Sequence, residues 1–250
     1  MIQKDTFQLI NKKTLSDTIS RDIEDYPSGL VLVLDKPLKW TSADAVRKMK
    51  FRLQRHFRQK NIKVGHAGTL DPLATGILLI CIGRATRKAE TLQAENKEYI
   101  AGIRFGATTP SYDLEKEIDE TYPFDHIDKE LIISLLDNLK GEIDQIPPIF
   151  SAKLINGQRA YDIARAGKEA EMKPSRVNIY DLDVISFTRP DLKIAISCSK
   201  GTYIRSFARD IGIAANSGAH LTSLIRTASG GYRIEEALTM EEAESLFDIS

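Results

Sequence analysis

The chain has 250 residues, of which 42% are hydrophobic and 28% are charged, so it can bury a core as one large domain or one domain with an appendage. It carries 35 basic and 35 acidic residues, so the net charge does not indicate nucleic-acid binding and any basic surface has to be local. No apolar run is long enough to span a bilayer, and the N-terminal residues lack the apolar core of a signal peptide. We therefore expect a globular protein that stays in the cytoplasm.

The two cysteines, Cys81 and Cys198, lie in apolar or strand-like stretches. This setting is typical of buried thiols rather than of a disulfide or a metal-binding pair. Redox chemistry is therefore not expected.

The first half of the chain begins with a polar extension, residues 1–28, which ends in a turn signature at Tyr26-Pro27-Ser28-Gly29. The apolar run 30–34 that follows predicts a buried strand at which a central sheet starts. Thr41 or Ser42 can cap a helix that continues toward Arg58. Residues 47–63 are rich in Lys and Arg and contain no acidic residue, so they form the local basic patch that the net charge hides.

The elements further along alternate irregularly, without the even rhythm of a barrel or a doubly wound fold. Predicted strands cover 77–82, 97–105, 177–187, 192–198 and 221–226, and predicted helices cover 128–139 and 202–213, followed by a short terminal helix with capping-box spacing at Thr239 and Glu242. The sequence therefore predicts an α+β protein with a mixed, largely antiparallel central sheet flanked by helices.

The densest chemical signal is the stretch 65–76, GHAGTLDPLATG, between the basic helix and a buried strand. Glycines and a proline around Asp71 describe a shaped backbone that could hold a carboxylate in a fixed place. Asp before Pro is also common in ordinary turns. From the residues alone, the structural and the catalytic interpretation stand about even.

This stretch resembles the catalytic signature of the tRNA pseudouridine synthase B (TruB) family. The TruB-type enzymes modify uridine 55 in the T arm of tRNA, and dyskerin is a eukaryotic relative of them. Further blocks agree with the family in order between about residues 29 and 230. They are Leu34-Asp35-Lys36-Pro37 with Thr41-Ser42, Lys97-Glu98-Tyr99, Ile146-Pro147-Pro148 with Ser151-Ala152-Lys153, Ser199-Lys200-Gly201-Thr202-Tyr203-Ile204-Arg205, and Gly218-Ala219-His220-Leu221 to Leu224 and Arg226.

The resemblance implies a pseudouridine synthase fold over residues 29–232, with 233–250 as a short C-terminal helical segment. Many bacterial members continue into a small RNA-binding domain of the PUA type, for which the residues after Gly231 leave no room. The family often has glycine in the loop after Lys-Pro, whereas here Leu38-Lys39-Trp40 follows, which puts the geometry of that loop in doubt.

The resemblance makes Asp71 the catalytic carboxylate, which could attack the base or assist its departure from the sugar. A buried Asp needs a cationic partner, and Arg205 matches the family position that supplies it, although an arginine on a helix can also be merely solvated. Tyr99 matches the active-site tyrosine that would stack on uracil and could move the proton from C5. A tyrosine in the middle of a strand is otherwise usually a packing residue.

The remaining site residues are carried over as the substrate pocket. His66 would fill the gap that the flipped uridine leaves, rather than act as an acid or base, although a histidine in a turn is the default interpretation. Tyr203 and Leu224 would line the base pocket, and Lys36 would either contact RNA or support the loop. The flanking residues Gly68, Thr69 and Leu70 complete the predicted substrate-binding set.

The predicted partner is the T arm of tRNA, with the basic helix along its phosphates. No metal, no cofactor, no membrane and no obligatory protein partner are expected, and the family implies a monomer. Three alternatives stay open: a noncatalytic tRNA-folding module that uses the same surface, a guide-dependent enzyme of the dyskerin kind, and a glycosidase that releases uracil.

Overall fold

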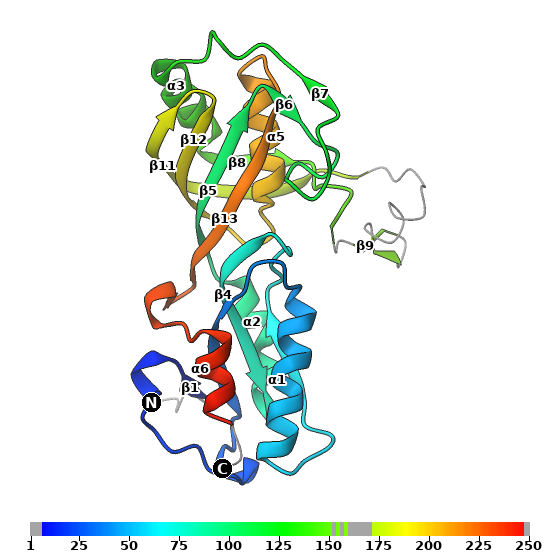
Figure 1. Cartoon of the computed structure of the whole chain (residues 1–250), viewed down its shortest axis with the longest axis vertical. Helices are drawn as coiled ribbons and strands as arrows, with labels where there is room; N and C mark the ends of the chain where they lie inside the picture. The colour runs from blue at the N-terminus through cyan, green and yellow to red at the C-terminus, as the bar shows by residue number, and fades with distance from the viewer. Residues whose placement is uncertain (1–6, 152–153, 156–157, 160–171, 248–250) are drawn as a thin grey trace. The chain divides into compact units, whose positions relative to one another are not determined.

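The computed structural model describes residues 7–151, 154–155, 158–159 and 172–247, and Figure 1 follows the chain through them. The chain folds as two compact units: unit 1 comprises Met1–Lys97 and Ile225–Ser250, and unit 2 comprises Glu98–Leu224. The unit boundaries do not coincide with the predicted domain boundaries at residues 28 and 232, which stay a prediction.

Unit 1 is built on a sheet in the order β1-β2-β4-β13, with β3 also paired to β4 and β14 to β13. The strands are β1 (Gln8–Ile10), β2 (Leu30–Lys36), β3 (Val64–Ala67), β4 (Ala74–Ile82), the second part of β13 (Ala219–Ser229) and β14 (Tyr232–Arg233). β1 pairs with β2 in parallel, whereas β2 and β3 each pair with β4 antiparallel. Part of the predicted N-terminal extension is thus an edge strand of this sheet.

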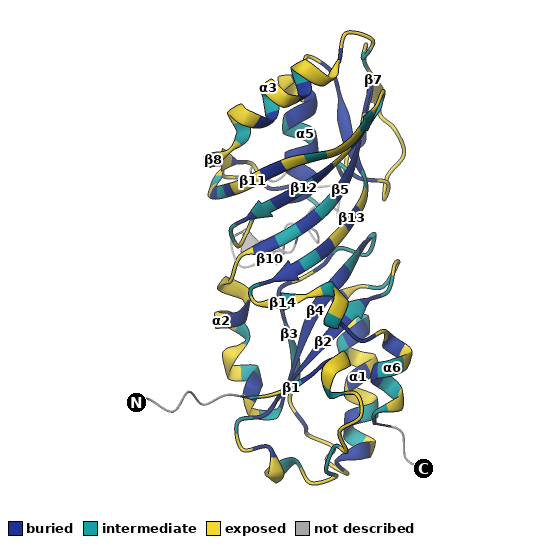
Figure 2. Cartoon of the chain, turned by 90° about the vertical axis from the view of Figure 1, so that its left-hand side faces the viewer, coloured by how far each residue is buried: buried dark blue, intermediate teal, exposed yellow. Residues whose placement is uncertain are grey.

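Strand β2 has both faces buried, which explains its continuous apolar run. Leu30, Leu32 and Leu34 belong to one core cluster, and Val31 and Val33 belong to the other. Figure 2 shows β2 and β4 in the colour of buried residues. The predicted buried strand is confirmed.

Two helices of unit 1 pack on the leucine side of this sheet, α1 (Ser42–His56) and α6 (Met240–Ser245). Each begins with a capping box, with Thr41 and Thr239 as the capping residues. Met49 and Leu53 of α1 share a core cluster with Met240 of α6, and Figure 2 shows the two helices next to each other. Short helices complete the unit: η1 (Lys12–Thr14), η2 (Ile23–Asp25), η3 (Gly83–Lys88), α2 (Ala89–Ala94) and η4 (Ile234–Glu236).

Unit 2 contains a sheet in the order β13-β5-β12-β11-β8. Its elements are β5 (Lys97–Phe105), β8 (Gly141–Gln145), β11 (Ser175–Thr188), β12 (Asp191–Cys198), the first part of β13, and the helices α3 (Lys129–Leu139) and α5 (Ile204–Ala214). Two short hairpin pairs accompany it, β6 (Ala107–Thr108) with β7 (Glu120–Thr121) and β9 (Leu154–Ile155) with β10 (Gln158–Arg159).

The fold class is therefore α+β with a mixed, largely antiparallel sheet, as the sequence predicts. One boundary prediction was wrong: α5 begins at Ile204 with Tyr203 as its N-cap residue, not at Thr202. The hydroxyl of Thr202 instead donates to the carbonyl of Ser199, so it closes the turn before the helix. In family block 146–153, Ala152 and Lys153 lie outside the described residues.

Cys81 and Cys198 are both buried and are not joined in a disulfide, as predicted. Across the part of the chain that the structure describes, no helix has the length and apolar character required to cross a membrane.

Candidate active site

Asp71 lies in a short loop, residues 68–73, between the end of β3 and the start of β4. We call this segment the Asp71 loop. The loop is shorter than the predicted stretch 65–76, because Gly65, His66 and Ala67 belong to β3 and residues 74–76 belong to β4. The β3 residues pair with β4, with His66 opposite Ile80, because the chain folds back on itself antiparallel at this point.

The residue before Asp71 is held by a side chain of helix α1. The amide of Leu70 donates to the hydroxyl of Ser42 at 2.8 Å, and that hydroxyl donates to the carbonyl of Leu70 at 3.1 Å. Both residues are buried, so these hydrogen bonds are protected from water. Thus the first turn of α1 fixes the position of the loop backbone next to Asp71.

The residue after Asp71 is held by the loop that follows β2. The carbonyl of Pro72 accepts from the amide of Lys39 at 2.8 Å. Lys39 adopts a φ of 67°, in the left-handed region that favours glycine. The loop after Lys36-Pro37 therefore turns through a left-handed residue at Lys39.

Lys36 is the last residue of β2 and is completely buried. Its ammonium group donates to the carbonyls of Trp40 at 2.6 Å, Pro37 at 2.8 Å and Pro72 at 3.5 Å. Burial lowers the pKa of Lys36 to about 8, although the negative charge of Asp71 acts in the opposite direction. These contacts favour the loop-supporting role over direct contact with RNA.

Arg226 of β13 contacts the start of the Asp71 loop and the strand β4 that follows it. Its guanidinium donates to the carbonyl of Ile77 at 2.7 Å, of Gly68 at 3.1 Å and of Thr69 at 3.4 Å. It is only 2% exposed. The sequence analysis gave this residue no role of its own.

The imidazole of His66 interacts with the same loop and with Arg226. Burial and the positive charge of Arg226 lower its pKa, partly offset by a hydrogen bond with the backbone of Gly68. The imidazole is therefore neutral near pH 7. A half-buried neutral ring fits the predicted stacking role better than a role as an acid.

In unit 2, Arg205 is the second residue of α5 and is 3% exposed. It forms an ion pair with Asp113 at 3.8 Å and donates to the carbonyls of Phe150 at 2.8 Å and Ser111 at 3.3 Å. Asp113 is buried too, and the sequence analysis missed it because it lies in an irregular segment without periodicity.

The other predicted residues of unit 2 are the aromatic Tyr99 and Tyr203 and the apolar Leu224. Tyr99 of β5 and Leu224 of β13 are each 8% exposed. Tyr203 is half-buried, and its backbone is bracketed by the side-chain amide of Gln145, which accepts from its amide at 2.8 Å and donates to its carbonyl at 3.1 Å. The start of α5 is thereby fixed in place.

The predicted residues therefore fall into two sets. Unit 1 brings together Asp71, His66, Gly68, Thr69, Leu70 and Lys36, and unit 2 holds Tyr99, Tyr203, Arg205 and Leu224. The pairing of Asp71 with Arg205 stays a prediction.

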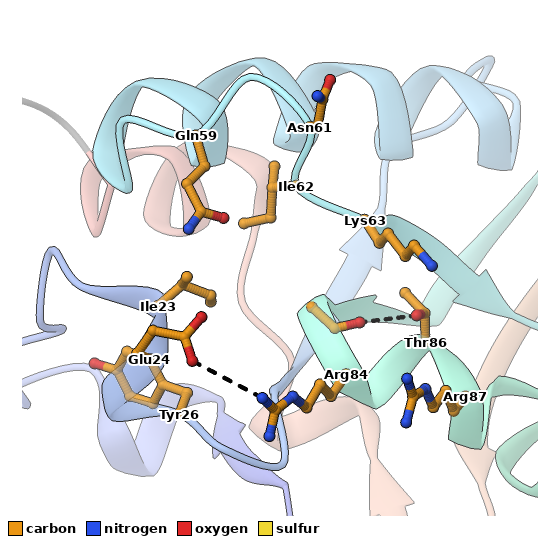
Figure 3. A pocket seen from close by; sticks show the side chains of 11 residues that line it. Ile23, Glu24, Tyr26, Gln59, Asn61, Ile62, Lys63, Arg84, Thr86 and Arg87 are labelled. Carbon is orange, nitrogen blue, oxygen red and sulfur yellow. Dashed lines mark hydrogen bonds and ion pairs between the residues drawn. The ribbon is translucent and has the colours of Figure 1, made fainter.

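The basic patch of α1 is partly neutralised from within unit 1. Glu244 of α6 forms ion pairs with Arg52 at 2.5 Å and Lys48 at 3.3 Å. Beyond the helix, a pocket of about 260 Å³ has Lys63, Arg84 and Arg87 in its lining together with one acidic residue, Glu24, which pairs with Arg84 at 3.9 Å. Figure 3 shows this pocket from close by.

Comparison with known proteins identifies the family. The TruB family pseudouridylate synthase (N terminal domain) profile matches residues 54–204. The chain is 52% identical to the tRNA pseudouridine synthase B of Phocaeicola vulgatus over 90% of this chain and 95% of that protein. It is 52% identical to the corresponding protein of Bacteroides fragilis over 86% of this chain and 92% of that protein.

Solved structures agree with this similarity. The chain superposes on a structure of a Cbf5-Nop10-Gar1 complex with a TM-score of 0.66 and 28% identity, covering 88% of this chain and 54% of that one. An archaeal box H/ACA sRNP Nop10-Cbf5 complex gives a TM-score of 0.62 and 26% identity, with the same coverage. The chain thus spans about half the length of these structural relatives. The profile and the full-length similarity together place this chain in the TruB family of pseudouridylate synthases.

Proposed function

We propose that this protein is a tRNA pseudouridine synthase that isomerises the T-loop uridine at position 55 to pseudouridine. The observation that carries the proposal is the tightly held Asp71 loop in a chain that is 52% identical to proteins named tRNA pseudouridine synthase B. Such a loop supplies a carboxylate at a fixed position, which a binding module would not need.

The reaction is an isomerisation in which no atom is gained or lost. The bond from N1 to C1′ breaks, the uracil rotates, a bond forms from C5 to C1′, and the proton on C5 leaves while N1 gains one. Asp71 can assist the first step by attacking the base or by supporting positive charge on the sugar. Both routes also need a group that takes the proton from C5.

The residues of unit 2 are proposed to complete the pocket. Arg205 would pair with Asp71 and favour its ionised form, because a nearby guanidinium stabilises a carboxylate. Tyr99 would stack on the uracil and take part in proton transfer from C5, and Tyr203 and Leu224 would line the pocket around the base.

The target uridine has to leave the folded T loop before chemistry, and unstacking a base costs a few kcal/mol. His66 would fill the gap that the base leaves, and its lowered pKa supports stacking as a neutral ring. The backbone of Gly68, Thr69 and Leu70 would contact the flipped nucleotide. Lys36 would hold the backbone next to Asp71 through its hydrogen bonds to carbonyls, rather than contact RNA.

The proposed partner is the T arm of tRNA, in the cytoplasm, with the protein acting as a monomer that needs no protein partner or cofactor. Basic residues of α1 and the neighbouring pocket would contact phosphates, which supplies affinity without sequence information.

The test is to incubate the purified protein with an unmodified tRNA transcript and map pseudouridine at single-nucleotide resolution. Wild type should modify the T-loop uridine, and Asp71→Asn should bind tRNA but form no product. Asp17→Asn, at an exposed carboxylate, is the matched control and should react like wild type. Binding without product from wild type would instead support a tRNA-folding module, and release of free uracil would indicate a glycosidase.

A further inference from the structure

Arg226 is an unusual residue to bury in a strand of a sheet. It is 2% exposed, and it is among the largest fully buried side chains in the described part of the chain. Burying a guanidinium is unfavourable unless its donors find acceptors. The acceptors that the structure provides are carbonyl oxygens of the backbone on both sides of Asp71.

We propose that Arg226 is a positioning residue that fixes the backbone of the Asp71 loop in its reactive geometry. This inference rests on the proposed function. The carbonyls of Gly68 and Thr69 lie in the first part of the loop, and the carbonyl of Ile77 lies within β4, the strand that follows the loop. One rigid group therefore ties the start of the loop to the strand that follows it.

The planar guanidinium is the side chain suited to this task. It presents five N–H donors in a fixed fork, so three of its nitrogens can reach three carbonyls that face different directions. A lysine at the same position has a single ammonium centre and cannot form all three hydrogen bonds with the same geometry.

The backbone of Arg226 contributes as well, through its close approach to Gly76. A Cβ built on Gly76 would lie 2.3 Å from the carbonyl oxygen and 2.7 Å from the amide nitrogen of Arg226. The absence of a side chain at Gly76 lets β13 approach β4 closely enough for the guanidinium to reach the loop. Side chain and backbone thus act on the same segment.

The charge of Arg226 is felt by two neighbours of Asp71. It lowers the pKa of His66, after the larger effect of burial, and it also acts to lower the pKa of Lys36. The positive charge of Arg226 thus acts on two residues that border the Asp71 loop.

The experiment compares Arg226→Lys and Arg226→Gln with wild type by single-turnover pseudouridine formation, tRNA Kd and thermal unfolding. Misplacing reacting groups by about 1 Å costs about 100-fold in rate, so we expect a fall of about that size in the rate of product formation. The Kd for tRNA should stay within about twofold, because phosphate contacts dominate affinity.

A matched control separates positioning from general loss of stability. Leu79 lies in β4, the strand that follows the Asp71 loop, and its side chain is only 1% exposed. Leu79→Ala should therefore lower the melting temperature without a selective fall in rate. The proposal is overturned if Arg226→Lys reacts at the wild-type rate, or if its rate falls only as much as that of Leu79→Ala. A wild-type protein without product would instead overturn the proposed function.

If both arginine variants fail to fold, hydrogen exchange in wild type provides the test. The Nε–H of Arg226 and the amides of Leu70 and Gly76 should then open with one shared free energy. Exchange of the loop amides while the Nε–H stays protected would show that the arginine does not hold the loop.

Discussion

The amide of Gly76 donates a hydrogen bond of 3.0 Å to the carboxylate of Asp35, one residue before the buried Lys36. Strands β2 and β4 are thus joined by a side chain at the point where β4 leaves the Asp71 loop. Gly76 has a φ of +99°, which L side chains rarely adopt. Both features make this glycine a requirement of the local backbone.

We expect Gly76→Ala to lower the free energy of unfolding by more than the roughly 1–3 kcal/mol of backbone strain alone, because the new Cβ would also meet the backbone of Arg226. Urea unfolding measures the loss. Gly65→Ala is the control, since a Cβ there has nothing within 4 Å, and it should leave stability close to wild type. Equal losses from the two variants would contradict this account.

Lys36 predicts a dependence of stability on pH. Its pKa is about 8 in the folded protein and 10.5 when unperturbed, so between these values the unfolded chain binds a proton that the folded chain has lost. Its contribution to stability therefore rises with pH from about 8 toward 10.5 and is flat below that range.

The difference in free energy of unfolding between wild type and Lys36→Met isolates this contribution, because the other groups titrate in both proteins. Measured from pH 7.5 to about 9.5, wild type should gain on the variant as pH rises. A constant difference over that range would mean that the ammonium group is not destabilised by its burial.

Glu244 predicts an effect on RNA affinity, because it forms ion pairs with Lys48 and Arg52 of the basic helix α1. Glu244→Gln removes this acidic partner of the basic helix and should tighten tRNA binding at low salt. Each additional phosphate contact steepens the dependence of log Kd on log salt concentration by about 0.7–0.9. Glu241→Gln removes an exposed charge from the same helix and serves as the control. Equal effects of both variants would point to net charge alone.

Asp113 predicts an effect on the rate of product formation, because its carboxylate forms an ion pair with the buried Arg205. Asp113→Asn keeps the shape but removes the charge, so we expect a fall of about 10- to 100-fold in single-turnover rate with tRNA binding retained. Asp119→Asn, at an exposed carboxylate of the same segment, should react like wild type. A normal rate in Asp113→Asn would assign the ion pair to folding only.

The sequence predicted the elements whose residues carry a local pattern. The apolar run 30–34 and the capping box at Thr239 both became the expected structures, because burial of both faces and satisfaction of free amides act over a few residues. The Asp71 loop was located correctly but predicted too long at both ends, since β3 is too short for a recognisable period and β4 begins at Ala74, before its continuous apolar run.

The supporting residues of the candidate site were not predictable in the same way. Arg226 and the Gly68 carbonyl are separated by 158 residues, and Arg205 and the Ser111 carbonyl by 94. No local pattern links such pairs, because the fold alone brings them together. Lys36 illustrates the same limit: its sequence context allowed RNA contact or loop support, and its burial favours the second.

The division of the chain into units also sets an order of assembly during synthesis. Unit 2 is one continuous segment, Glu98–Leu224, whereas unit 1 needs Ile225–Ser250 to join residues made much earlier. Domains fold as they emerge from the ribosome, N-terminal parts first. Arg226 is made 158 residues after Gly68, so the Asp71 loop cannot reach its final geometry until unit 2 has been synthesised and Arg226 has followed it.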